Sequence, residues 1–172
     1  MFSRRQFMTL SATAGVAVIA LGVLPKFADG EALAPKDSPI GTFEVQHSDA
    51  EWRAMLSDDQ YQVLRHEDTE RPYSSPLNEE HRDGTFACAG CALPLFSSST
   101  KFDSRTGWPS FWAPLDNATA IRTDTSFGVT RKEVHCQRCG GHLGHVFTDG
   151  PKPTGLRYCM NGLAMKFEKT AA

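Results

Sequence analysis

The 172-residue chain lacks several features that would assign it to a common class. It has no run of basic residues, no low-complexity tract outside the N-terminal leader, and no repeat beyond two short cysteine motifs. Its formal net charge is −2, and without a basic patch a nucleic-acid partner is not expected. No uncharged apolar stretch reaches the ~20 residues of a membrane-spanning helix. The composition, 40% hydrophobic and 22% charged, is that of an ordinary globular domain.

Residues 1–30 have the layout of an export signal. Arg4 and Arg5 are followed by Phe7, and residues 10–24 are apolar or small and carry no charge. A positive start before a short apolar stretch is typical of a signal peptide, and the adjacent arginines resemble a twin-arginine signal. We therefore expect the protein to be exported to the periplasm. The sequence does not single out one cleavage site. An uncleaved N-terminal membrane anchor and a cytosolic amphipathic segment are the alternatives.

The rest of the chain divides into a linker and one domain. Residues 31–46 show little periodicity and are expected to link the leader to a domain at 47–169. Two capping-box patterns predict short helices at 49–56 and 58–66. After residue 70, short segments broken by Gly, Pro, Asn and Asp indicate a mainly antiparallel β domain. The expected strands are 84–88, 119–123, 126–130, 132–136, 145–147, 156–160 and 163–167.

Four of the five cysteines form two Cys-x-x-Cys pairs, Cys88 with Cys91 and Cys136 with Cys139. Two residues between thiols let one turn place both sulfurs on the same cation, and two such turns supply four tetrahedral ligands. We therefore predict a structural Zn²⁺ site. Because four thiolates leave no open coordination position, we assign this metal no catalytic role. Two disulfides or a redox-active dithiol are the alternatives.

The fifth cysteine, Cys159, is the candidate nucleophile. It follows a loop rich in Gly and Pro, and Arg157 lies two positions before it. Alternate residues of a strand share a face, so the guanidinium is placed to stabilise a thiolate at position 159. A buried structural cysteine is the other interpretation, because free cysteines are often buried.

Two histidines and a tryptophan are the other candidates for chemistry. His142 and His145 follow the second cysteine pair, and since the metal already has four sulfurs, acid catalysis or substrate hydrogen bonding suits them better. Trp108 lies in an aromatic loop bounded by Gly and Pro and is suited to contact a thioether methyl group. Histidines satisfied within the fold and a core tryptophan are the alternatives.

Taken together, these segments resemble the type B methionine sulfoxide reductase family, whose members reduce the R epimer. The resemblance runs from about Trp52 to Phe167. The motifs that carry it are Arg82–Cys91, Pro94–Phe96, Lys101–Ser104, Gly107–Phe111, Cys139–Phe147 and Arg157–Asn161.

The resemblance implies a fold and a site. The fold would be two antiparallel sheets stapled by a Cys₄ zinc site, with the metal opposite the active site and short N-terminal helices. Cys159 would be the nucleophile and Trp108 would hold the substrate methyl group. We also expect substrate contacts from Phe147 and Arg157. The residues expected around the reacting sulfoxide are His145 as first choice of acid, His142 as second, and Asn161 as a hydrogen-bond donor.

The expected chemistry is oxidation of Cys159 to a sulfenic acid as methionine sulfoxide, free or in proteins, becomes methionine. Many family members carry a resolving cysteine just before the Gly-Trp-Pro motif, where this chain has Thr106 and no sixth cysteine exists. We therefore expect regeneration by an external thiol, such as a thioredoxin-like protein, and a monomeric enzyme.

A second departure is Gly162-Leu163-Ala164, where the family usually shows Ser-Ala-Ser or a close variant. Any help from that serine in positioning Cys159 is absent, which concerns efficiency rather than reaction type. Two other functions remain open. A non-catalytic zinc-binding β module that binds a protein partner would not need Cys159, and a thiol–disulfide oxidoreductase would need a redox-active pair.

Overall fold

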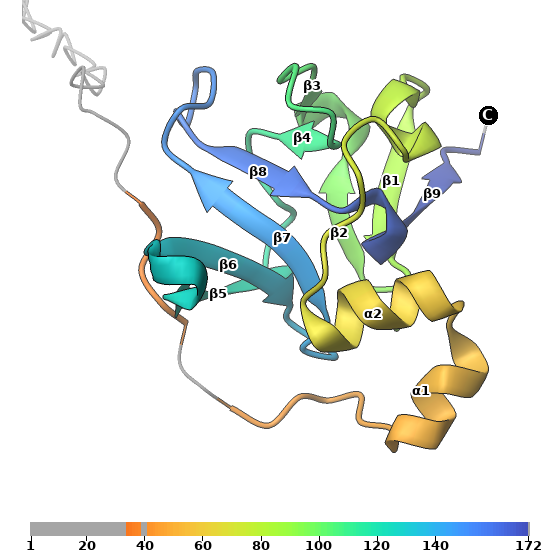
Figure 1. Cartoon of the computed structure of the whole chain (residues 1–172). Coiled ribbons are helices and arrows are strands. Elements are labelled where there is room, and N and C mark those ends of the chain that lie inside the picture. Colours follow the sequence, from red (N-terminus) through yellow and green to blue (C-terminus); the bar gives the residue numbers. More distant parts are fainter. Residues whose placement is uncertain (1–33, 39–40, 172) are drawn as a thin grey trace, which may run out of the picture. The chain divides into compact units, whose positions relative to one another are not determined.

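Two antiparallel sheets form the body of the domain in this computed structural model, which describes residues 34–38 and 41–171. The smaller sheet has the strand order β2–β1–β9 and the larger sheet β3–β4–β8–β7–β6–β5 (Figure 1). This confirms the predicted mainly β fold. The strands are β1 Gly84–Cys88, β2 Pro94–Ser97, β3 Lys101–Phe102, β4 Ser110–Phe111, β5 Thr119–Asp124, β6 Arg131–Cys136, β7 His142–Phe147, β8 Arg157–Met160 and β9 Met165–Lys169.

The two predicted helices are confirmed almost to the residue, as α1 (Asp49–Met55) and α2 (Asp58–His66). Each begins at a complete capping box, in which a serine hydroxyl accepts a backbone N–H and a Glu or Gln side chain returns the bond. Helix α2 lies against β7 and the short turn η4 (Gly162–Ala164) (Figure 1). Its buried face therefore covers β7, one of the strands that carry the candidate site, and the turn η4.

Aromatic side chains from both sheets meet in the core. Phe86 of β1 and Phe96 of β2 contact Phe111 of β4, with ring centroids 4.9 and 4.4 Å apart. All three side chains are completely buried. Because burying one such ring contributes about 2 kcal/mol, this contact between the sheets is a substantial part of what holds them together.

Some predicted strands were wrong in detail. The alternating segment 126–130 is not a strand, because Ser126–Gly128 form a 3₁₀ turn, η3, and Val129 is 56% exposed. Gly128 has a φ of +73°, which suits the turn between β5 and β6. The segment 163–167 begins as the turn η4 and becomes strand only at Met165.

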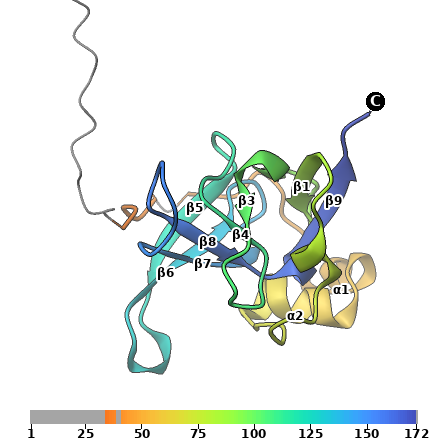
Figure 2. The same ribbon diagram turned by 90° about the horizontal axis from the view of Figure 1, so that it is seen from above.

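The segment expected to be a linker makes specific contacts with the domain. Ser38 donates its backbone N–H to Ile121 of β5 and its hydroxyl accepts the Ile121 N–H, at 2.7 and 3.0 Å. Asp37 pairs with Lys132 of β6 at 2.8 Å. These bonds place the lead-in along the outer edge of the larger sheet (Figure 2). The expected export signal, residues 1–30, lies outside the described residues.

The described residues contain no helix that is both long enough and apolar enough to cross a membrane.

Candidate functional site

A bulge in β7 puts both predicted histidines on the same face of the larger sheet. On a regular strand, residues 142 and 145 would point to opposite faces. In the pairing with β6, one step along β6 matches two steps along β7, and Leu143 is the extra residue. The rings of His142 and His145 consequently lie 5.5 Å apart between centroids. The i, i+3 spacing of the two histidines therefore brings their side chains together only because of the bulge.

The bulge depends on Gly144. Its φ is +154°, and a Cβ built at this position would lie 2.2 Å from the carbonyl oxygen of Cys159. Only glycine therefore lets β7 approach β8 this closely.

Cys159 lies between a serine and a histidine in a row that crosses the sheet. It is opposite Ser110 of β4 on one side and His145 of β7 on the other. Glu133 of β6 is opposite His145 in turn. Residues directly opposite each other on neighbouring strands project from the same face with Cβ atoms about 5 Å apart. The fold thus brings the predicted nucleophile and the predicted acid together.

His142 is held by a buried carboxylate. Its Nδ1 lies 2.7 Å from Glu133 Oε1, and both side chains are 3% exposed. Among the described residues, its other ring nitrogen, Nε2, is buried and has no hydrogen-bond partner. Burial opposes ionisation of Glu133, but its bonds to His142 and Arg122 outweigh burial and lower its pKa. A carboxylate on Nδ1 keeps that nitrogen protonated, so Nε2 is the atom left for a ligand.

His145 has a carboxylate partner of its own. Its Nε2 lies 2.9 Å from Asp124 Oδ2, and Arg131 donates to the same oxygen at 2.7 Å. Burial lowers the pKa of His145, and the bond to Asp124 opposes that shift in part. The pKa of Asp124 lies well below its usual value, first because of Ser126 and further because of His145 and Arg131. Both histidines, with Asp124, Glu133 and Arg131, line a cavity of about 290 Å³.

Cys159 itself is half-buried among hydroxyl groups. Its Sγ lies 3.7 Å from Thr106 Oγ1, which is linked through Ser104 to Ser110 by contacts of 2.8 and 2.7 Å. Burial raises the pKa of the Cys159 thiol, and Thr106, Arg157 and Ser110 oppose that rise. Because burial is the largest of these effects, the thiolate is the minor form in the free protein at neutral pH.

Arg157 shares the face of Cys159, as the alternation along a strand predicted. Its guanidinium forms two bonds of 2.8 Å with Asp149 and lies 4.4 Å from the ring centroid of Phe147. Phe147 is opposite Arg157 in the β7–β8 pairing. The two residues expected to contact substrate therefore form one unit beside the nucleophile, with the cation fixed by the carboxylate.

Trp108 and Asn161 meet at one residue that the sequence analysis did not single out, Glu70. The indole Nε1 donates to the Glu70 carbonyl at 3.1 Å, and the Glu70 N–H donates to Asn161 Oδ1 at 3.1 Å. Asn161 Nδ2 donates to the carbonyl of Leu143, the bulge residue, at 3.2 Å. The amide of Asn161 is thus buried and engaged with the fold, with a second N–H on Nδ2.

The four paired cysteines gather into one cluster. Their sulfurs all lie within 4.8 Å of one another, with Cys88 and Cys139 at 3.7 Å and Cys91 and Cys136 at 3.5 Å. A tetrahedral ion with metal–sulfur bonds of ~2.3 Å places its sulfurs about 3.8 Å apart, whereas a disulfide needs about 2.05 Å. The cysteines of the described chain are free, so the cluster fits a metal ion and not two disulfides.

The cluster joins the two sheets. Cys88 ends β1 in the smaller sheet and Cys136 ends β6 in the larger one. Two guanidinium groups donate to ligand carbonyls, Arg65 to Cys139 at 3.2 Å and Arg138 to Cys91 at 3.3 Å. Their positive charge offsets the negative charge that four thiolates would bring to the site.

Comparison with known families decides where the chain belongs. Residues 56–169 match the SelR domain, the domain of MsrB proteins. The chain belongs to the MsrB family. Similar relatives, each called peptide methionine sulfoxide reductase MsrB, come from Pseudomonas putida strain W619 (57% identity over 69% of this chain and 90% of the relative), Thiobacillus denitrificans (55%; 70% and 92%) and Agrobacterium fabrum (50%; 76% and 98%).

Three acidic residues of the site were missed in the sequence. Asp124 and Glu133 lie in strands with ordinary alternation, and only the bulge and the strand register show that they face the two histidines. Glu70 lies in a loop, where no pattern predicts burial. Asp124 and Glu133 can be recognised as site residues only when the strand pairing of β5, β6 and β7 is known.

Proposed function

We propose that this protein reduces methionine-R-sulfoxide, free or within oxidised proteins, through a sulfenic acid at Cys159. Membership of the MsrB family supports a methionine sulfoxide reductase. The observation that supports the finer proposal is the placement of Cys159 directly opposite His145, whose ring centroid lies 5.5 Å from that of His142. A nucleophile beside two candidate proton donors is the arrangement that sulfoxide reduction needs.

The chemistry would proceed in two stages. The thiolate of Cys159 attacks the sulfoxide sulfur, and a histidine protonates the oxygen as the sulfur–oxygen bond breaks. The oxygen leaves as water, and the Cys159 sulfur is then bonded to the substrate sulfur. A water molecule attacks the Cys159 sulfur, which breaks this S–S bond, releases methionine and leaves Cys159 as a sulfenic acid, so that the Cys159 sulfur has supplied the two electrons. One external thiol then forms a mixed disulfide and releases water, and a second thiol restores Cys159. A thioredoxin-like protein is the expected reductant.

His145 is the first candidate for the acid, because it faces Cys159 across the strand pair, and His142 is the second. Each ring has a carboxylate on one nitrogen. At His145 the bond to Asp124 favours the protonated form that an acid needs and opposes in part the lowering of its pKa by burial. Trp108, Phe147 and Arg157 would border the substrate. Asn161 would offer its second amide hydrogen to the sulfoxide oxygen.

We infer that the metal of the four-sulfur cluster is Zn²⁺, because four thiolates are its usual structural ligand set. The ion would stabilise the fold and take no part in the reaction. We further propose that the protein is exported to the periplasm through its twin-arginine-like leader. On this route the chain would fold and bind its metal before it is exported. Changing Arg4 and Arg5 to Lys and following the protein in cell fractions tests this part.

Turnover of separated R and S epimers by the metal-loaded protein tests the proposed activity. Methionine formed with dithiothreitol as reductant is measured for the unaltered protein and for Cys159→Ser. We expect turnover of the R epimer alone, and none by the variant. A protein that turns over neither epimer would contradict the proposal and favour a non-catalytic zinc module.

A further inference from the structure

Glu70 is a buried carboxylate that the reaction does not use. The residue is 7% exposed and lies in the loop between α2 and the 3₁₀ turn at Pro76–Glu79. Burial raises the pKa of this carboxyl, although bonds from the amides of Gly162 and Leu163 oppose the rise. A buried acidic group is costly unless hydrogen bonds satisfy it. The burial of the Glu70 carboxyl group therefore indicates a structural or functional role, because a buried charge does not contribute to solubility.

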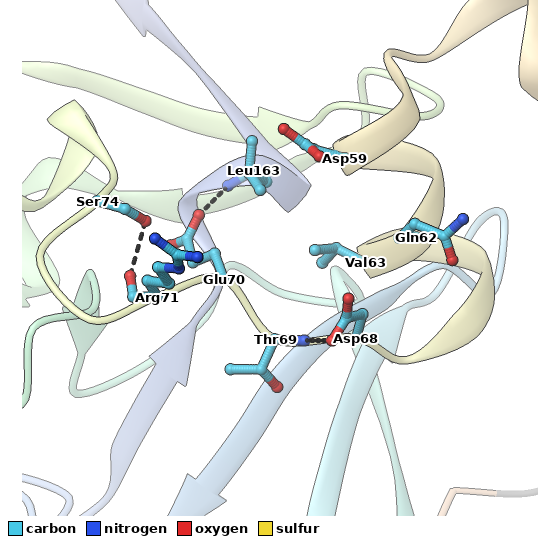
Figure 3. Close-up of a pocket in the computed structure, with 9 residues that line it drawn as sticks. All are labelled: Asp59, Gln62, Val63, Asp68, Thr69, Glu70, Arg71, Ser74 and Leu163. Atoms are coloured by element: carbon cyan, nitrogen blue, oxygen red, sulfur yellow. Dashed lines mark hydrogen bonds between the residues drawn. The ribbon is translucent and has the colours of Figure 1, made fainter.

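The carboxylate of Glu70 holds the turn that follows the nucleophile strand. Oε1 accepts the N–H of Gly162 at 2.6 Å and Oε2 accepts the N–H of Leu163 at 2.9 Å. Figure 3 shows the carboxylate reaching from its loop to Leu163. Gly162 comes three residues after Cys159, directly after the end of β8. Two charge-assisted bonds thus fix the backbone just beyond the nucleophile.

The backbone of Glu70 holds two more parts of the proposed substrate site. Its carbonyl accepts the indole N–H of Trp108, and its own N–H is bound by Asn161 Oδ1, both at 3.1 Å. Through Leu143, the same Asn161 amide reaches the bulge between the two histidines. Glu70 is therefore bonded to the indole wall, to Asn161 and to the turn after β8.

The close approach at Gly162 shows how tightly this contact is built. A Cβ at position 162 would lie 1.9 Å from Ser75 Oγ and 3.3 Å from Glu70 Oε1. A side chain there would push the Glu70 loop away from the turn. In this chain the carboxylate of Glu70, and not a serine of the turn, supplies the polar contact next to the nucleophile strand.

We propose that Glu70 is a positioning residue. Its carboxylate anchors the Glu70 loop to the 162–163 turn, and the Glu70 carbonyl thereby fixes the position of the Trp108 indole relative to Cys159. This inference rests on the proposed function. Glu70 contacts neither substrate nor the sulfur of Cys159. Its loss should therefore weaken the hold on the substrate methyl group while the thiol keeps its intrinsic reactivity.

The test compares Glu70→Gln with the unaltered, metal-loaded protein. Glutamine keeps one acceptor but turns an N–H₂ group toward the second backbone N–H. We expect KM for methionine-R-sulfoxide to rise on the order of tenfold, because small misplacements of a positioning contact are costly. The rate at which iodoacetamide alkylates Cys159 without substrate should stay within about twofold, since that reaction does not use Trp108.

Glu51→Gln is the matched control. Glu51 also accepts a backbone N–H, that of Ser48 at 2.7 Å, but it caps helix α1 far along the chain from the site. It should lower thermal stability and leave KM unchanged. Glu70→Asp keeps the charge on a shorter side chain, and it replaces the Gln variant in this measurement if the Gln variant does not fold. The KM of Glu70→Asp should rise as well.

An unchanged KM in a folded Glu70 variant, accompanied only by a lower Tm, would show a purely structural role and overturn the inference. The unaltered protein distinguishes the two proposals. If it fails to reduce the R epimer, the proposed function is contradicted and the inference with it. If it turns over normally while the Glu70 variants keep its KM, only the inference is wrong.

Discussion

Cys159 and His145 lie directly opposite each other on neighbouring strands, and the protein shifts their pKa values in opposite directions. Burial raises the pKa of the thiol and lowers that of the imidazole. In the proposed reaction, Cys159 acts as a thiolate and His145 as an imidazolium. At a pH between the two pKa values this combination is a minor species, and its fraction depends on the difference between the two pKa values. Under that proposal, neighbouring charges that bring the two pKa values closer together would raise the rate.

Asp124→Asn should lower kcat/KM by a similar factor at every pH between the two pKa values. Asp124 raises the pKa of His145 against the effect of burial, so its loss lowers that pKa further. Each unit by which the gap widens costs about tenfold in the reactive species. The measurement is kcat/KM for the R epimer across neutral pH. The exposed Asp116→Asn is the control, and a profile equal to that of the unaltered protein would exclude His145 as the acid.

Arg157→Met should slow alkylation of Cys159 at neutral pH. The guanidinium lowers the pKa of the thiol, so without it the pKa rises and less thiolate is present at a given pH. The rate of iodoacetamide modification is followed by peptide mass spectrometry as a function of pH. The inflection of this pH profile should then lie at a higher pH than in the unaltered protein. Lys169→Met removes an exposed charge from the other sheet and should change nothing. An inflection that moves to lower pH would contradict the role given to Arg157.

Thr106→Cys should convert the protein into one that resolves its own sulfenic acid. Thr106 Oγ1 lies 3.7 Å from Cys159 Sγ, so a thiol in its place starts close to the sulfur it must reach. One equivalent of substrate without reductant should give a disulfide between positions 106 and 159, detected by mass spectrometry of non-reduced peptides. The unaltered protein and Thr106→Ser should carry one added oxygen instead. An intramolecular disulfide of Cys159 in the unaltered chain would refute regeneration by an external thiol.

Removal of the metal should destabilise the fold far more than loss of the nucleophile. The cluster joins β1 to β6, and structural zinc contributes folding energy directly. Chelation, or Cys91→Ser, should lower Tm by more than about 10 °C, whereas Cys159→Ser should stay within about 3 °C of the unaltered protein. Elemental analysis should find one zinc per chain. Folded protein that contains no metal and has an unchanged Tm would contradict a structural role for zinc.

The sequence predicted well those features whose cause is local. Ser48 and Ser57 begin helices because each cap is completed within four residues, and the cysteine pairs are readable because each pair is made in one turn. Strand β2 and the two-residue strands β3 and β4 were missed, since pairing with other strands defines them. Alternation alone placed a strand at 126–130, where Gly128 makes a turn.

The sequence named candidate reactive side chains, which the structure places close together, but not the carboxylates that hold them. Cys159, His142 and His145 are side-chain types capable of such chemistry and lie in short motifs, so they can be named as candidates without a structure. Glu133 and Asp124 become significant only through a bulge of one residue, and Glu70 only through bonds to residues more than thirty positions away. Such relationships are long-range and leave no periodic signal in the chain.

The bonds from Ser38 to Ile121 have a practical consequence for any shortened version of this protein. Strand β5 is the last strand of its sheet, and this lead-in occupies backbone groups that would otherwise be open to another polypeptide. A truncation that starts at residue 47 would retain every helix and strand named above but would uncover that rim. Concentrated solutions of it should therefore be more prone to edge-to-edge aggregation than the longer form.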